Sequence, residues 1–224
     1  MLSQIIQKLH QFLPGLLSTL GIFLSVLGTS FIFACILSYW SNRGVVWINF
    51  LIEKFVFFIR GTPLLVQIFI VYYGLGQFEC LQESFLWPIL KEPMYCAWLG
   101  LSMNATAYAT ALFSGNIRNI DLGQIEASLA LGMDRPQILL HILLPQAIKN
   151  SLGSYSNEII LILKSTSLAS SISILELTGL TRQFISETYN AIEWFFLAGI
   201  LYVILNLFFM SVFKLTTRNL KVVM

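Results

Sequence analysis

The stretch that decides the fold is Gln11–Asn42, QFLPGLLSTLGIFLSVLGTSFIFACILSYWSN, which contains no Asp, Glu, Lys or Arg. About 20 apolar residues are enough for a helix to cross the hydrocarbon core of a bilayer. We therefore predict a transmembrane helix over residues 12–40. This apolar run is far longer than the roughly 7 to 15 residues of a signal peptide's apolar region. We expect it to stay in the mature protein.

The composition of the whole chain agrees with a membrane protein. Hydrophobic residues make up 57% of it, charged residues only 11%, and the mean hydropathy is +0.78. A soluble domain carries about 25% charged residues. The net charge of +2 and the lack of a dense Lys/Arg run argue against a nucleic-acid partner. The cysteines lack metal-ligand or disulfide-framework spacing, so we predict neither a metal site nor a cofactor.

Four further apolar stretches complete an all-α integral membrane fold of five transmembrane helices in one domain, residues 1–224. Their approximate ranges are 47–75, 93–115, 150–170 and 193–213. Pro63 should bend the second span, because proline removes a backbone donor and clashes one turn back. An alternative is an interfacial elbow before Arg60 followed by a shorter span. The fourth span is weakly apolar because it contains Glu158 and Lys164.

Basic residues predict the orientation, because loops on the cytoplasmic side carry an excess of Lys and Arg. With the N-terminus outside and the C-terminus inside, the cytoplasmic segments hold Arg43, Arg118, Arg135, Lys149, Lys214, Arg218 and Lys221. The outer segments then hold Lys8, Lys91 and Arg182. The same model places most acidic residues outside, at Glu79, Glu83, Glu92, Glu176, Glu187 and Glu193.

The loop between the third and fourth spans, residues 117–149, is amphipathic and too polar to cross. Residues 124–131 are predicted to form a short helix that Gly132 ends, since glycine reaches the left-handed conformation. Asp134 is a plausible N-cap for a second helix with Pro136 in its first turn, running to Pro145. We predict a helix, a hinge and a helix that together form a cytoplasmic docking element.

The residues of this loop resemble the EAA signature of ABC importer permeases. Glu126-Ala127-Ser128 is followed after three residues by Gly132 and, after nine more, by Ile142-Leu143-Leu144-Pro145, with the full spacing of that signature. Three other runs resemble the polar amino acid branch of the superfamily. They are Arg60-Gly61-Thr62-Pro63-Leu64-Leu65-Val66-Gln67, Asn157-Glu158 and Lys164-Ser165-Thr166-Ser167-Leu168. The likeness extends from about Gly15 to Lys214.

This resemblance implies the type I ABC importer permease architecture in the bacterial cytoplasmic membrane. The chain would be one of two permease subunits, identical or similar, above two ATP-binding subunits, and an extracytoplasmic solute-binding protein would deliver a polar amino acid. The residues implied to contact the ATPase are Glu126, Ala127, Gly132, Asp134, Ile142 and Pro145. The sequence has no phosphate-cradling GxxxxGK[ST] loop. We therefore expect no enzymatic activity in this chain and ATP hydrolysis in a partner subunit.

Polar residues inside the predicted spans are candidates for the substrate path, because charge at membrane depth is costly and usually faces the protein interior or water. At 100° per residue, Glu158 and Ser165 lie on one stripe of the fourth span, and Asn157 and Lys164 lie on another. Asn104 on the third span completes the candidate set. An equally weighted alternative is a structural ion pair in which Glu158 or Glu53 meets Lys164, Lys54 or Arg60.

Two departures from the family pattern leave the charge of the substrate open. Ala111 and Ser114 stand where relatives commonly have an acidic and a basic residue, and Ser165 stands where they often have Asp. Two rival functions are a stand-alone secondary transporter or channel that uses Glu158 and Lys164 as an ion relay, and a non-transporting membrane scaffold. Secondary transporters usually contain paired internal repeats, and none is visible in this sequence.

Overall fold

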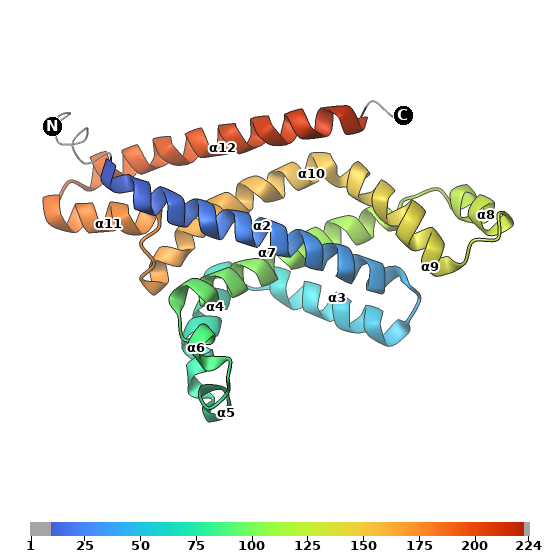
Figure 1. The fold of residues 1–224 in the computed structure, drawn as a ribbon, viewed down its shortest axis with the longest axis horizontal. Coiled ribbons are helices and arrows are strands. Elements are labelled where there is room, and N and C mark those ends of the chain that lie inside the picture. Colours follow the sequence, from blue (N-terminus) through green and yellow to red (C-terminus); the bar gives the residue numbers. More distant parts are fainter. Residues whose placement is uncertain (1–9, 222–224) are drawn as a thin grey trace.

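The computed structural model describes residues 10–221, with side chains up to residue 217, and every regular element in this part of the chain is helical. Lys8 and the side chains of Arg218 and Lys221, which contribute to the predicted orientation, lie outside the described residues. The long helices α2 (Leu13–Asn42), α7 (Pro93–Arg118), α10 (Leu144–Ser165) and α12 (Ala191–Lys221) run along the longest axis of the molecule (Figure 1).

Helix α7 lies at the centre, between α2 and α10 (Figure 1). Its buried face is rich in small residues, including Ala97, Gly100, Ala105 and Ala109. A Cβ at Gly100 would lie 3.2 Å from Cγ1 of Ile68, so the absence of a side chain lets the two segments approach closely. Small residues serve this purpose at helix contacts in membranes, where hydrophobic burial alone gives little drive for association.

The second apolar stretch is broken at Thr62 and Pro63. Helix α3 (Val46–Gly61) ends there, and α4 (Leu64–Phe69), η2 (Ile70–Gly74) and η3 (Leu75–Gln77) follow. The two helical parts differ in direction by 107°. Thr62 is extended because proline disfavours the helical conformation in the residue before it. The chain therefore turns sharply here, where the sequence predicted a bend in one long helix.

The fourth stretch is longer than predicted, because the helix does not end at Pro145. Helix α9 (Arg135–Ile138) continues through η4 (Leu139–Leu143) into α10, and η5 (Thr166–Ile172) follows. The segment η4 is a π-helical turn immediately before Pro145. A proline inside a helix removes one hydrogen bond and clashes with the preceding turn. The wider π turn accommodates this local disruption without breaking the run.

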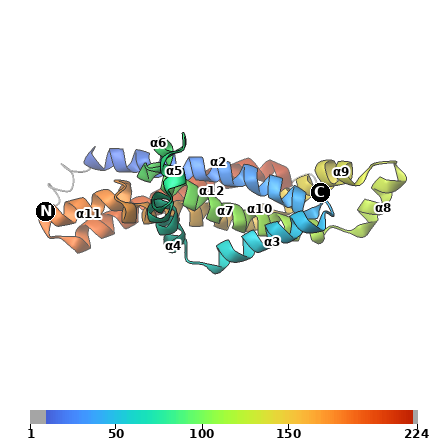
Figure 2. The same cartoon turned by 90° about the horizontal axis from the view of Figure 1, so that it is seen from below.

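At the opposite end of the molecule from α8 (Leu122–Ala130) and α9, helix α11 (Leu177–Thr188) packs against α2 and α12 (Figure 2). Its N-cap is Glu176, whose side chain is fully buried and accepts hydrogen bonds from the backbone N–H groups of Thr178 and Gly179. Tyr202 on α12 donates its hydroxyl to the same carboxylate at 2.8 Å. Two short helices, α5 (Glu79–Gln82) and α6 (Trp87–Leu90), lie in the connection before α7.

Length and hydropathy identify α2 and α12 as candidate membrane spans among the described residues. The number rises to four if each bent pair counts as one span, namely 46–61 with 64–77 and 135–172 with 177–188. Helix α7 has 26 residues, which at about 1.5 Å each is long enough to cross a bilayer. Its small and polar residues make it less apolar than α2 and α12. The protein is therefore an all-helical membrane protein with two to four candidate spans by this measure.

Candidate functional site

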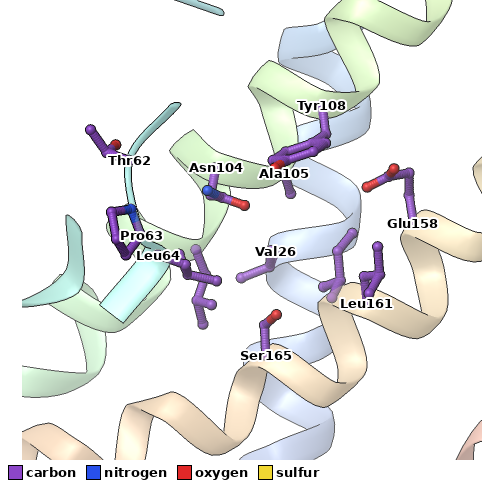
Figure 3. Close-up of a pocket in the computed structure, with 12 residues that line it drawn as sticks. Val26, Thr62, Pro63, Leu64, Asn104, Ala105, Tyr108, Glu158, Leu161 and Ser165 are labelled. Atoms are coloured by element: carbon purple, nitrogen blue, oxygen red, sulfur yellow. The ribbon is translucent and has the colours of Figure 1, made fainter. Parts of the chain in front are cut away.

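The break between α3 and α4 faces helices α7 and α10 across a cavity of about 320 Å³. Figure 3 shows Asn104 and Tyr108 from α7 on one side of it and Glu158 and Ser165 from α10 on the other. Val26 of α2 contributes an apolar part of the wall. Polar groups from three segments thus converge on one space in the middle of the helix bundle.

Gln67 fixes the shape of the break that forms one wall. Its side-chain amide donates to the carbonyl oxygens of Ile59 and Thr62, at 2.7 and 3.0 Å, and lies 2.9 Å from Thr62 Oγ1. Its side-chain oxygen accepts a hydrogen bond of 3.1 Å from Asn104 Nδ2. The carbonyl groups that the break releases are therefore satisfied inside the protein, as membrane-embedded irregular backbone requires. Asn104 is both a lining residue and the link from α7 to the break.

The charges around the cavity have opposite signs. Glu158 is partly buried on α10, and the positive charge of Arg60 acts on its carboxylate. The Arg60 guanidinium also lies over the Tyr108 ring, 5.0 Å from the ring centroid. Such a cation–π contact gains strength where water is excluded. Glu158 therefore faces the cavity together with Tyr108, whose ring contacts Arg60.

The structure brings together three of the five predicted path residues. Asn104, Glu158 and Ser165 line the cavity, whereas Asn157 and Lys164 are exposed and lie outside its lining. The predicted set lacked Thr62, Pro63 and Tyr108, which also line it. The sequence did contain a signal for Thr62 and Pro63, because a proline disfavours the helical conformation in the residue before it and so marks a break in a helix.

Glu53 forms none of the ion pairs that the sequence analysis considered, with Lys164, Lys54 or Arg60; its partner is Arg118. Its Oε1 lies 3.0 Å from Nη2 of Arg118, at the end of α7, and also accepts a hydrogen bond from Asn49 at 3.2 Å. This pair joins α3 to the C-terminal end of α7, outside the lining of the cavity. It is roughly half exposed on each side, so we assign it little stabilising free energy by itself.

The predicted docking element is a second candidate site, at one end of the molecule (Figure 1). Asp121 caps α8 by accepting a 2.7 Å hydrogen bond from Gly123 N–H, and Gly132 has φ of +80°. Asp134 then forms a capping box with Gln137, with distances of 2.8 and 3.0 Å. Helices α8 and α9 (Arg135–Ile138) are thus each capped at the N-terminus, and the short turn between them contains one left-handed residue, Gly132.

The outward face of this element is available to a partner. Glu126 and Ala127 are exposed on α8, and exposed leucines surround them at Leu122, Leu129 and Leu131. The inward face packs Ile125 and Ile142 against a buried cluster of Ile117, Ile120, Ile138, Leu139, Leu143, Leu144 and Ala147. Gln146 Nε2 donates to Gln124 Oε1 at 2.7 Å and ties α8 to α10. Pro145 is exposed at the start of α10. Exposed apolar residues around a carboxylate are typical of a protein-binding surface.

Comparison with known proteins gives a consistent picture. The family model "Binding-protein-dependent transport system inner membrane component" matches residues 30–222. The octopine transport system permease protein OccM of Rhizobium radiobacter is 43% identical over 196 residues, covering 88% of this chain and 79% of that protein. The arginine ABC transporter permease protein ArtM of Escherichia coli K12 is 48% identical over 163 residues, covering 72% and 71%.

A solved structure described as an amino acid ABC transporter with histidines has the same fold. Its TM-score is 0.83 at 27% sequence identity, and the match covers 96% of this chain and 97% of that one. The family model spans most of the chain, and the relatives share both sequence and fold with it. The chain therefore belongs to the family of binding-protein-dependent transport system inner membrane components, as a multi-pass permease subunit of an ABC importer whose ATPase is a separate partner.

Proposed function

We propose that this chain forms the membrane path of an importer for a cationic amino acid or an arginine-derived opine. The observation that carries the proposal is the carboxylate of Glu158 in a polar cavity in the middle of the bundle. Its permease relatives are named for octopine and arginine, which both carry a guanidinium group. A carboxylate and a guanidinium form strong charge-assisted hydrogen bonds.

The other polar groups suit the backbone end of such a solute. Asn104 and Tyr108 on α7, with Ser165 on α10, offer both donors and acceptors within the same cavity. The volume of about 320 Å³ lies at the lower end of the roughly 300–1,000 Å³ typical of small-molecule sites. A single amino acid is the class of solute that this cavity favours. Asn157 and Lys164 would then contribute through other contacts, such as a second permease chain.

We further propose five membrane crossings with the N-terminus outside. They are α2, the broken segment α3–α4–η2, α7, the α10–η5 run and α12. This arrangement leaves α8, Glu126, Ala127 and the Gly132–Asp134 hinge on the cytoplasmic side, where the ATPase would bind. Ile142 and Pro145 would support that surface from behind. A reporter fused after Lys221 should be cytoplasmic and one inserted at Glu83 should be external; the same compartment for both would contradict the model.

The proposed mechanism is alternating access. Closure of the ATPase pair on ATP would draw the docking elements of two permease chains together and open the path outward, where the solute-binding protein releases its cargo. Hydrolysis would return the path to the inward-open state. A second permease chain, identical or similar, belongs to this model because five helices present too small an interface to enclose a pathway.

Uptake by the reconstituted complex tests the substrate. We expect labelled arginine to enter vesicles only when ATP and the ATPase are present, and Glu158→Gln to lower arginine uptake at least tenfold. Glu79→Gln is the matched control, because it makes the same change at an exposed glutamate outside the cavity lining. Uptake of a sugar or peptide instead of amino acids would refute the proposal. Uptake without ATP would favour a secondary transporter, and no uptake at all would favour a scaffold.

A further inference from the structure

A second cavity of about 310 Å³ lies next to the one described above, toward the cytoplasmic end of α7 in the proposed orientation. Its lining comes from α3 on one side and from the C-terminal part of α7 on the other, with Ser41 at the end of α2. The polar and charged members of that lining are Ser41, Glu53, Arg60, Thr110, Ser114 and Arg118. We call it the lower cavity and the first one the upper cavity. The two are similar in volume, and the lower cavity has more charged residues in its lining.

Arg60 and Tyr108 stand between the two cavities. Tyr108 lines the upper cavity and Arg60 lines the lower one, and the guanidinium lies 5.0 Å from the ring centroid. A cation–π contact is a weak noncovalent interaction, so the two side chains can separate to let a solute pass. A solute that passes between them would move from one cavity directly into the other.

Two residues that line the lower cavity carry a buried hydroxyl group that the protein itself does not satisfy. The hydroxyl oxygens of Thr110 and Ser114 are buried and have no hydrogen-bond partner among the described residues. The two residues are 1% and 7% exposed. A buried polar group without a partner destabilises the fold, so such groups call for an explanation in terms of a ligand or water. Both residues line the lower cavity.

The charges of the lower cavity favour one end of an amino acid. Glu53 is engaged by Arg118 at 3.0 Å and by Asn49. Arg60 adds a second guanidinium to the lining. The described lining therefore has one more positive than negative charge, which suits a carboxylate. The upper cavity, in contrast, has the Glu158 carboxylate and suits a cation.

We infer that the lower cavity is a second solute site on the path, which holds an amino acid by its α-carboxylate after the solute passes Arg60 and Tyr108. Arg118 and Arg60 bind the carboxylate, and the Thr110 and Ser114 hydroxyls rotate from their buried positions toward the cavity to supply hydrogen bonds. The Glu53–Arg118 pair holds Arg118 in place when the site is empty. The inference rests on the proposed function, because it assumes that the upper cavity receives the same solute.

Protection of introduced thiols tests this inference in the complete transporter in nanodiscs, after replacement of Cys35, Cys80 and Cys96. Ser165→Cys reports on the upper cavity and Ala111→Cys on the lower one, and each is labelled with a small water-soluble thiol reagent. We expect arginine to slow labelling at least fivefold at both positions. Agmatine, which is arginine without its carboxylate, should slow labelling only at Ser165→Cys.

The carboxylate contact predicts a further difference. Arg118→Gln should remove arginine protection at Ala111→Cys and leave it at Ser165→Cys. Arg43→Gln, a change at another cytoplasmic arginine, is the control and should leave protection unchanged at both positions. Arginine protection at Ala111→Cys that survives Arg118→Gln would overturn the inference.

The two proposals fail in different ways. Protection by arginine at Ser165→Cys alone would refute the lower site and leave the proposed function intact. Protection by agmatine at both positions would refute recognition of the carboxylate. If arginine protects neither position, both the lower site and the assigned substrate are refuted.

Discussion

Asn104 on α7 donates a 3.1 Å hydrogen bond to the side-chain oxygen of Gln67, and the amide of Gln67 donates to the carbonyls of Ile59 and Thr62. One buried side chain therefore connects the central helix to both sides of the helix break. This link explains how a segment without regular hydrogen bonding keeps a defined shape next to the cavity.

Gln67→Leu should destabilise the permease, because it leaves the Thr62 carbonyl and the Asn104 amide without the partner they have here, and leaves the Ile59 carbonyl only its longer, 3.4 Å hydrogen bond from the Thr62 hydroxyl. Each buried polar group that loses its partner costs about 1–3 kcal/mol. We expect a lower Tm for the purified complex and reduced arginine uptake. Gln77→Leu is the control, since Gln77 is exposed on the same segment and makes one 3.4 Å hydrogen bond. Equal Tm values for the two variants would contradict the role of Gln67.

Glu176→Ala should destabilise the end of the bundle where α11 packs against α2 and α12. The change removes the cap of α11 and one partner of the Tyr202 hydroxyl, and a lost cap alone costs about 0.5–2 kcal/mol. Asp121→Ala removes the cap of α8. This cap is exposed, so the change should lower stability less than Glu176→Ala does. Thermal unfolding of the two purified variants measures the difference. A larger loss in Asp121→Ala would show that burial of Glu176 does not matter.

Glu126→Ala should leave the permease folded and weaken its hold on the ATPase. Glu126 is exposed, and we expect its replacement to change folding stability by no more than about 0.5 kcal/mol. At an interface, leaving the opposite charge unpaired costs roughly 2–5 kcal/mol. Co-purification of the ATPase is the measurement, with Glu83→Ala in the outer connection as control. Normal ATPase retention and uptake in Glu126→Ala would mean that the docking surface lies elsewhere.

Gly132→Ala should disturb the docking element through the backbone. Gly132 has φ of +80° and a Cβ built there meets no atom within 4 Å, so the cost is conformational and not steric. A left-handed conformation costs a residue with a side chain about 1–2 kcal/mol. Gly44→Ala is the matched control, since Gly44 has φ of +91° and is equally open. We expect ATPase retention to fall only in Gly132→Ala; an equal fall in both would indicate a general effect of backbone strain.

Much of the docking element was predictable from the sequence because its structure depends on neighbouring residues. The left-handed Gly132 and the N-cap of Asp134 are confirmed. Helical periodicity also predicted that Glu158 and Ser165 share a stripe, and they do line one cavity. In these cases each residue acts on others within two helical turns, so a single sequence contains enough information.

The features that the sequence did not predict depend on distant partners. Pro63 indicated a break, but the 107° turn also requires Gln67 to meet Asn104, which is 37 positions away. Glu176 looked like one more acidic residue of an outer loop, yet Tyr202 from the last helix completes its burial. The continuation of the helix through Pro145 depends on a π turn that no simple residue pattern announces.

The unbroken helical run from Arg135 to Ser165 has a consequence for how this gene can change in length. Each residue of a helix adds about 100° of rotation and 1.5 Å of rise. One extra codon between Pro145 and Glu158 would turn Glu158 away from the cavity while the docking element stayed in place. The π turn at η4 already contains one such extra residue, absorbed beside Pro145. The rotational phase between the two ends of this run is therefore a property that selection must preserve, even where the identity of the intervening residues can drift.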